Sequence, residues 1–177
     1  MAQFKLPYYK EHIDFHIDDE RVAGVLVSKV EEYIPNDTES GLVEEALLKP
    51  IGQVPLKELA KEKKHIVIIS SDHTRPVPSH ITMPIILKHI RSSNPDAKIT
   101  ILIATGMHRP TTHEELVAKY GEKIVNEENI VIHDAYKDED MTFKGILPSG
   151  GELWVNKLVD ECDLLISEGF NFFISNI

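Results

Sequence analysis

The stretch "IVIISSDHTRPVPSH", residues 66–80, runs from apolar β-forming residues into a polar turn that two prolines close. The apolar run predicts a buried strand, because continuous stretches of Val and Ile mark strands that are covered on both faces. "SHITMPIILKHIRSSN", residues 79–94, predicts an amphipathic helix, and "KITILIAT", residues 98–105, predicts a second buried strand. Strand, helix and strand in this order predict two neighbouring parallel strands of an α/β sheet.

The same alternation continues along the chain. "THEELVAKYG" predicts a helix with a capping signature at its start, because Thr112 is followed by Glu114 and Glu115. The next elements are predicted as a strand in "NIVIHDA", a helix in "GELWVNKLVDEC" and a fourth strand in "DLLISEGF", which are residues 129–135, 151–162 and 163–170. We therefore predict an α/β fold, a Rossmann-like doubly wound parallel sheet with helices on both faces.

The N-terminal third adds a different pattern. "FKLPYY" and "HIDFHI", residues 4–9 and 12–17, alternate with period 2 and predict a small β-hairpin region. "ESGLVEEALLKPIG", residues 39–52, predicts a helix with an apolar face. The length of 177 residues fits one domain, or one domain with a small appendage, and we assign residues 1–177 to a single α/β domain.

Composition narrows the classes of partner. The formal net charge of −10 argues against a nucleic-acid partner, which would require a basic surface. The single cysteine, Cys162, cannot form an internal disulfide and suits a reduced compartment. The N-terminus has no signal-peptide pattern, and no apolar run reaches the roughly 18 residues that span a membrane. The expectation is a soluble, cytoplasmic protein with no membrane partner.

Two polar clusters stand where strands are predicted to end. "SSDHTRP" follows the first strand, and "ATGMHRP", residues 104–110, follows the second. Ligands of such sheets bind outside the carboxyl ends of the strands, so we expect Asp72, Arg75 and His108 to face a common pocket. Each residue also has an ordinary interpretation, since an Asp before a turn often caps backbone N–H groups and a loop Arg often pairs with a nearby acid.

Two common nucleotide-binding motifs are absent from the sequence, and one histidine pair resembles a metal site. The sequence contains neither a Walker A motif nor G-x-G-x-x-G, the usual fingerprints for nucleoside triphosphates and dinucleotides. His12 and His16 have the spacing of helical metal ligands, but they lie in a predicted strand and are interpreted as surface residues. No metal site is predicted in this chain.

The motifs "SDHTRPVPS", "ATGMHRPTTHEEL" and "LPSGGELWVNKLVDECDLLISEGF" together resemble the N-terminal domain of the lactate racemase family. The resemblance extends to about Phe170. It implies an isomerase that interconverts the enantiomers of a small 2-hydroxy acid such as lactate. The implied cofactor is the nickel pincer nucleotide, pyridinium-3,5-bisthiocarboxylic acid mononucleotide nickel, which accepts and returns a hydride.

The resemblance also implies roles for particular residues. His108 matches one of two catalytic histidines, and Asp72, His73, Thr74 and Arg75 match the loop that binds the cofactor nucleotide. Arg75 is also expected to bind the substrate carboxylate, for which its planar guanidinium is well shaped. Proteins that synthesise the cofactor are implied as partners.

The resemblance ends before the chain does. After "ISEGF" the family pattern continues through Pro-His, a Phe-Ser-Gly-Gly turn and a lysine, whereas this sequence reads "NFFISNI". We therefore expect no counterpart of the second catalytic histidine, of the lysine that attaches the cofactor, or of the family's C-terminal domain. The chain is expected to be an incomplete racemase, inactive alone and unable to hold the cofactor covalently. The alternative is a non-catalytic nucleotide-binding module. The apolar tail at residues 172–174 predicts self-association in solution, or a disordered tail where no partner surface is available.

Overall fold

The computed structural model describes residues 1–29 and 32–169. The chain divides into two compact units, Met1–Asn36 and a second that begins at Asp37. The assignment of residues 1–177 to one domain stays a prediction. The predicted self-association falls on residues 172–174, which lie outside the described residues.

The first unit is an antiparallel hairpin of β1 (Ala2–Tyr8) and β2 (Glu11–Ile17), followed by a short 3₁₀ helix, η1 (Asp19–Arg21). This confirms the hairpin predicted from the period-2 pattern. His12 and His16 are exposed on β2, as the sequence indicated.

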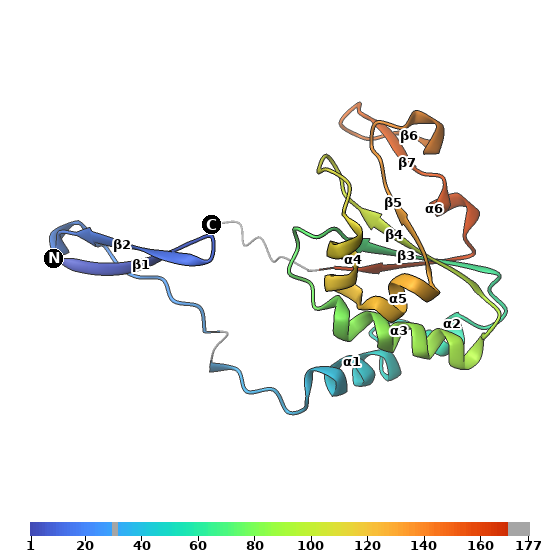
Figure 1. Cartoon of the computed structure of the whole chain (residues 1–177), viewed down its shortest axis with the longest axis horizontal. Coiled ribbons are helices and arrows are strands. Elements are labelled where there is room, and N and C mark those ends of the chain that lie inside the picture. The colour runs from blue at the N-terminus through green and yellow to red at the C-terminus, as the bar shows by residue number, and fades with distance from the viewer. Residues whose placement is uncertain (30–31, 170–177) are drawn as a thin grey trace. The chain divides into compact units, whose positions relative to one another are not determined.

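The second unit contains the α/β layer (Figure 1). Its elements in chain order are α1 (Glu39–Leu48), α2 (Leu56–Leu59), β3 (His65–Ser71), α3 (Ser79–Ser93), β4 (Lys98–Ala104), α4 (His113–Tyr120), α5 (Glu122–Glu127), β5 (Asn129–Ile132), η3 (Asp138–Asp140), β6 (Met141–Ile146), β7 (Glu152–Asn156), α6 (Leu158–Glu161) and β8 (Leu164–Glu168). Within the described ranges, none of the helices is long and apolar enough to cross a membrane.

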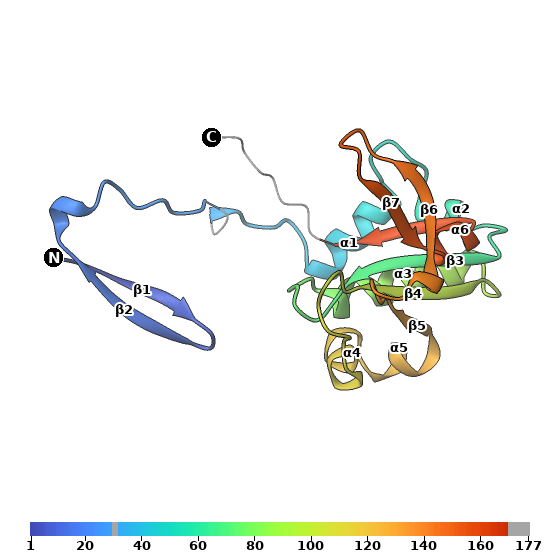
Figure 2. The ribbon, with the colours of Figure 1, turned by 90° about the horizontal axis from the view of Figure 1, so that it is seen from above.

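The parallel sheet has the strand order β5-β4-β3-β8. The chain moves outward from β3 through β4 to β5 and then returns to the free side of β3 as β8. Figure 2 shows β3 and β8 side by side and pointing the same way. The strand order therefore reverses between β3 and β8, and in sheets of this kind ligands bind at that reversal, outside the carboxyl ends of the strands.

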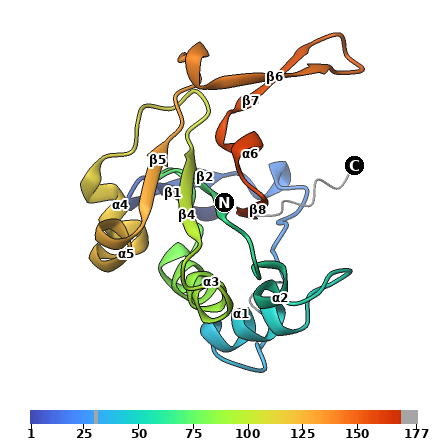
Figure 3. The same ribbon diagram turned by 90° about the vertical axis from the view of Figure 1, so that its right-hand side faces the viewer.

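Alternate residues of the strands build the core on one face of the sheet. Ile68 lies opposite Ile101 on β4 and opposite Ile166 on β8, and Ile68 and Ile101 are fully buried. Residues of α2, α3, α4 and α5 pack against this face and complete the core. The short helix α6 lies on the opposite face (Figure 3). Helices therefore flank the parallel sheet, which confirms the predicted fold class.

The helix predicted over residues 151–162 is wrong for its first half. Residues Glu152–Asn156 form the strand β7, which pairs antiparallel with β6, and only Leu158–Glu161 are helical. The pairing is supported by Trp154, because the centre of its ring lies 5.2 Å from the centre of the Phe143 ring on β6. Gly150, with φ +86°, occupies the connecting turn in a conformation that favours glycine. Periodicity alone does not distinguish a strand from a helix in a short apolar run, and here the pairing with β6 makes this segment a strand.

Candidate functional site

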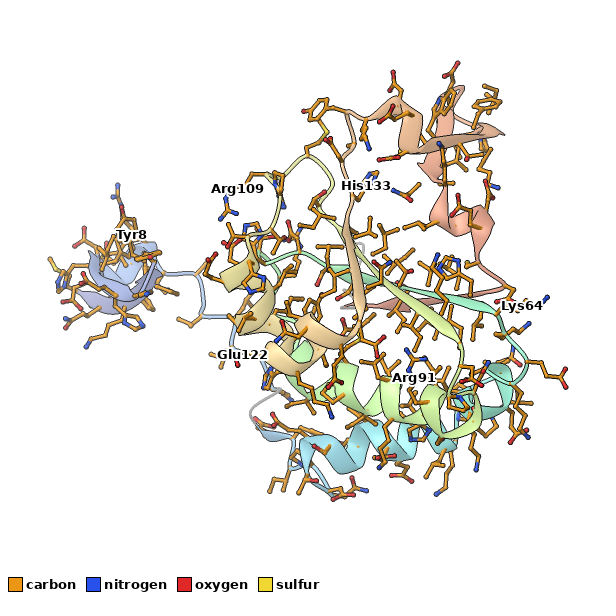
Figure 4. The ribbon with its side chains drawn as sticks, turned by 45° about the vertical axis from the view of Figure 1, so that its right-hand side comes forward. Tyr8, Lys64, Arg91, Arg109, Glu122 and His133 are labelled. Atoms are coloured by element: carbon orange, nitrogen blue, oxygen red, sulfur yellow. The ribbon has the colours of Figure 1, made fainter. Side chains whose placement is uncertain are left out.

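The carboxyl ends of β3, β4 and β8 surround a cavity of about 430 Å³. Asp72 and Arg75 reach it from the loop after β3, His108 from the loop after β4, and Glu168 from the end of β8. The expectation that Asp72, Arg75 and His108 share one pocket is therefore confirmed. Figure 4 marks the two edges of the sheet: Arg109 and His133 follow β4 and β5 at the carboxyl edge, and Lys64 precedes β3 at the other.

Asp72 and His108 are in direct polar contact at this cavity. The Nδ1 atom of His108 lies 2.5 Å from the Oδ2 atom of Asp72. The loop that carries His108 turns sharply at Gly106, whose φ of +55° favours glycine, and the N–H of His108 donates to the carbonyl of Thr105 at 3.0 Å. The turn brings the imidazole back over the end of β3.

The carboxylate of Asp72 is 2% exposed and fully hydrogen-bonded. Its Oδ1 atom accepts the backbone N–H of Thr74 at 3.0 Å and the Thr74 hydroxyl at 2.6 Å. Burial by itself would raise the pKa of Asp72, but the hydrogen bonds from Thr74 and His108 outweigh it and hold that pKa below its usual value. Asp72 is therefore an anion that is fixed in place at neutral pH.

The geometry assigns the two ring nitrogens of His108 different tasks. A carboxylate can only accept, so Nδ1–H donates to Asp72 and the Nε2 atom carries the lone pair of the neutral ring. The side chain of His108 is 47% exposed, so Nε2 is accessible to a ligand in the cavity. A histidine that is oriented by a buried carboxylate in this way is arranged to accept a proton from a ligand.

Arg75 contributes an uncompensated positive charge. Its side chain is exposed and lines the same cavity as Asp72 and His108. Among the described residues, its guanidinium makes neither a hydrogen bond nor an ion pair. The ordinary interpretation of a loop arginine, pairing with a nearby acid, therefore does not apply to the described part of the chain, and Arg75 is available to an anionic ligand.

Two of the predicted site residues, Thr74 and His73, make contacts that hold the loop after β3 in place. The Thr74 hydroxyl donates a hydrogen bond to Asp72 and so orients that carboxylate. The Nδ1 atom of His73 lies 3.1 Å from the Thr111 hydroxyl and 3.7 Å from the Glu115 carboxylate, so it joins the loop after β3 to the start of α4. His73 lines a neighbouring cavity instead of this one. Binding of the cofactor nucleotide by Asp72, His73, Thr74 and Arg75 stays a prediction.

Glu168 is the residue of the site that the sequence analysis missed. Its Oε2 atom accepts the hydroxyls of Ser70 at 2.5 Å and Ser79 at 3.0 Å, and Oε1 accepts the hydroxyl of Thr82. The buried hydroxyl of Tyr120 donates to Ser70 at 2.7 Å. An acid at the end of a predicted strand, in "ISEGF", was the available signal. Glu168 therefore ties the end of β8 to β3 and to the first turn of α3.

We expect Glu168→Gln to lower the free energy of unfolding by about 1–3 kcal/mol, because the charged acceptor of three hydroxyl donors is replaced by a neutral amide with one acceptor oxygen. Urea unfolding measures this difference. The control is Glu127→Gln, which changes an exposed acid on α5 and should stay within about 0.5 kcal/mol of the parent. Equal stabilities of the two variants would show that the hydroxyl cluster contributes nothing to the fold.

Among the residues that the structure describes, no group of three or more His, Cys, Asp and Glu side chains could hold a metal ion. The cavity combines the carboxylates of Asp72 and Glu168, one accessible imidazole and one guanidinium that has no partner among the described residues. These groups suit a ligand with an anionic group and an exchangeable proton.

Comparisons with known proteins agree with this site. The sequence profile of the lactate racemase N-terminal domain matches residues 8–174. The chain is 57% identical over 170 residues to a lactate racemase of Lactiplantibacillus plantarum and 51% identical over 170 residues to one of Thermoanaerobacterium thermosaccharolyticum. Each alignment covers 96% of this chain and 40% of the relative, so the chain spans about two fifths of their length. The structure of the lactate racemase apoprotein from T. thermosaccharolyticum matches with a TM-score of 0.84 at 50% identity, over 96% of this chain and 39% of that one.

Proposed function

Because this chain belongs to the lactate racemase family and matches its N-terminal domain, we propose that it supplies one side of the active site of a 2-hydroxy-acid racemase. The observation that carries the proposal is the contact of 2.5 Å between Asp72 and His108, beside the guanidinium of Arg75, which is unpaired within the described residues. These three side chains provide what a 2-hydroxy acid requires, a base for its hydroxyl and a cation for its carboxylate.

In the proposed reaction, His108 acts as the general base. The Nε2 lone pair accepts the hydroxyl proton of one enantiomer as that substrate is oxidised to a 2-keto acid, and the cofactor, when bound, would take up the hydride from the same carbon. When the keto acid is reduced back to this enantiomer, His108 returns the proton to the oxygen. Asp72 holds the ring in the required tautomer and stabilises the imidazolium that forms. A positioned acid/base group of this kind typically contributes about 10²–10⁴ to the rate.

Arg75 is proposed to bind the substrate carboxylate. A guanidinium presents parallel N–H donors that match the two oxygens of a carboxylate. Its position at the same cavity as His108 would fix the substrate with its hydroxyl near Nε2. Arg75 therefore orients the substrate and leaves the proton transfer to His108.

The proposed cofactor is the nickel pincer nucleotide, which when bound would take up the hydride and return it. The residues fit its organic part, since the cavity lies at the reversal of strand order and is lined by polar loops with a free cation. We propose that Asp72, His73, Thr74 and Arg75 contact it. Among the described residues, no group of three or more metal-binding side chains lies together.

The proposed setting is the cytoplasm, where the cofactor-synthesis proteins would load the enzyme. Lactate is the proposed substrate, on the basis of the relatives that are named for it.

The proposal is tested with a racemase chimaera, in which residues 1–169 of this chain replace the matching segment of the T. thermosaccharolyticum lactate racemase. We expect the chimaera, once loaded with cofactor, to interconvert D- and L-lactate, as followed by chiral chromatography. The intact relative is the control for loading. A chimaera that folds and binds the cofactor but does not racemise lactate would contradict the proposal and favour a nucleotide-binding module.

A further inference from the structure

A second cavity, of about 290 Å³, lies between the loop after β3 and the helix α4. Its lining is dominated by side chains that carry or can carry positive charge. The lining residues are His73, Arg75, Val77, His80, Glu115, Ala118 and Lys119. The proposed racemase chemistry uses none of the residues that α4 contributes to it.

Lys119 is an unpaired cation in this cavity. Its Nζ atom donates to the hydroxyl of Ser71 at 3.3 Å and lies 5.8 Å from the centre of the Tyr120 ring, and in the described residues no carboxylate lies within ion-pair distance of it. The protein has 29 acidic and 19 basic residues, so carboxylates are in excess and a half-buried lysine without one is notable. Burial lowers the pKa of Lys119 although the carboxylates of Glu168 and Asp72 act in the opposite direction. A bound anion would favour the charged form of Lys119 and so raise the pKa that burial lowers.

Arg75 lines this cavity as well as the larger one, and its guanidinium is likewise unpaired within the described ranges. Two cations from different elements therefore meet at one small cavity. The side chains of His73 and His80 add ring nitrogens to the same lining.

Glu115, the acid in the lining, is already neutralised. Its two oxygens accept the guanidinium of Arg109 at 2.9 and 2.6 Å, and Oε2 also accepts the backbone N–H of Thr112. The hydrogen bond from Arg109 is the main cause that lowers the pKa of Glu115 to about 2. The charge that remains for a ligand comes from Lys119 and Arg75.

We propose that this cavity binds a phosphate monoester group, with Lys119 and Arg75 as its cationic ligands. A phosphate presents acceptor oxygens in several directions and carries close to two negative charges, which matches donors arriving from two elements better than a planar carboxylate does. The cavity is at the small end of the range for ligand pockets, about 300–1,000 Å³, and suits one group of a larger molecule. If that molecule is the cofactor's mononucleotide, the inference rests on the proposed function, and Lys119 becomes its phosphate ligand.

Titrations of the chain with inorganic phosphate and with nicotinamide mononucleotide, followed by calorimetry and by NMR of the backbone amides, test the inference. We expect Lys119→Met to weaken phosphate binding by about 10- to 100-fold, the usual loss for a charge-assisted hydrogen bond. Lys119→Arg should restore most of the affinity. The control, Lys123→Met, removes an exposed lysine of α5 and should leave binding unchanged.

Binding of both probes, weakened by Lys119→Met, assigns the cavity to a nucleotide phosphate, and binding of inorganic phosphate alone assigns it to the free ion. Absence of phosphate binding, or equal affinity in the parent and Lys119→Met, overturns the inference. Those results would leave the racemase proposal intact, because that proposal is judged by lactate turnover in the chimaera.

Discussion

His108→Gln is expected to lower the racemisation rate of the chimaera by about 10²–10⁴. The glutamine amide can still donate to Asp72, so the buried carboxylate keeps a partner, but it has no basic nitrogen to accept the substrate proton. The loss should therefore appear in kcat and leave cofactor loading largely unchanged. Steady-state kinetics with D- and L-lactate, together with the absorbance of the bound cofactor, separate the two effects.

The matched control for this variant is His113→Gln, which changes an exposed histidine at the start of α4. It should retain the activity of the parent chimaera. If His108→Gln keeps more than about a tenth of the parent rate, His108 is not the base, since a general base contributes at least about 10². Equal loss of activity and of cofactor binding would point to damage of the loop after β4 instead.

Asp72→Asn is expected to reduce turnover by at least about 10², although the side chain keeps its size. The amide can donate its N–H to the Nδ1 atom of His108, which then carries the lone pair, and the proton moves to Nε2. The ring would keep its place and present the wrong nitrogen to the substrate. Kinetics of the chimaera measure the loss, and NMR of the imidazole nitrogens reports the tautomer. A variant with parent turnover would show that Asp72 does not orient the base.

The same substitution should change the acid stability of the chain. The folded-state pKa of Asp72 is lowered, so its carboxylate stabilises the fold above its unfolded-state pKa of about 4, and this contribution is lost as the pH falls through the folded-state value. The melting temperature of the parent should therefore exceed that of Asp72→Asn at pH 6, and the difference should shrink below pH 4. A difference that stays constant across this range would mean that the lowered pKa is not linked to folding.

The sequence was sufficient to predict the parallel sheet and the meeting of Asp72, Arg75 and His108 at its carboxyl edge. Continuous apolar runs locate the buried strands, and the prolines in "SSDHTRP" and "ATGMHRP" locate their ends, so the meeting of Asp72 with His108 follows from parallel pairing of β3 and β4. The capping box of α4, in which Thr112 and Glu115 exchange hydrogen bonds, was also readable from local spacing.

The remainder depends on contacts that local patterns do not encode. Glu168 reaches Ser70 across 98 residues of sequence, and Lys119 reaches Ser71 across 48, so neither partner is visible from its own neighbourhood. The strand β7 was taken for a helix because its identity depends on the partner strand β6. Side chains that act through distant partners require the fold to be known first.

The spacing of the Asp72–His108 pair has a consequence for how the chain acquires its structure. The two residues are 36 positions apart and are joined by a single strand–helix–strand crossover, whereas Glu168 joins β3 only when β8 is added 98 residues away. Closing a short loop costs less chain entropy than closing a long one. During synthesis, the first strand pair and its helix are complete on the ribosome well before β8 emerges. The Asp72–His108 pair therefore belongs to the earliest section of the sheet that can assemble, and the closure by Glu168 comes late.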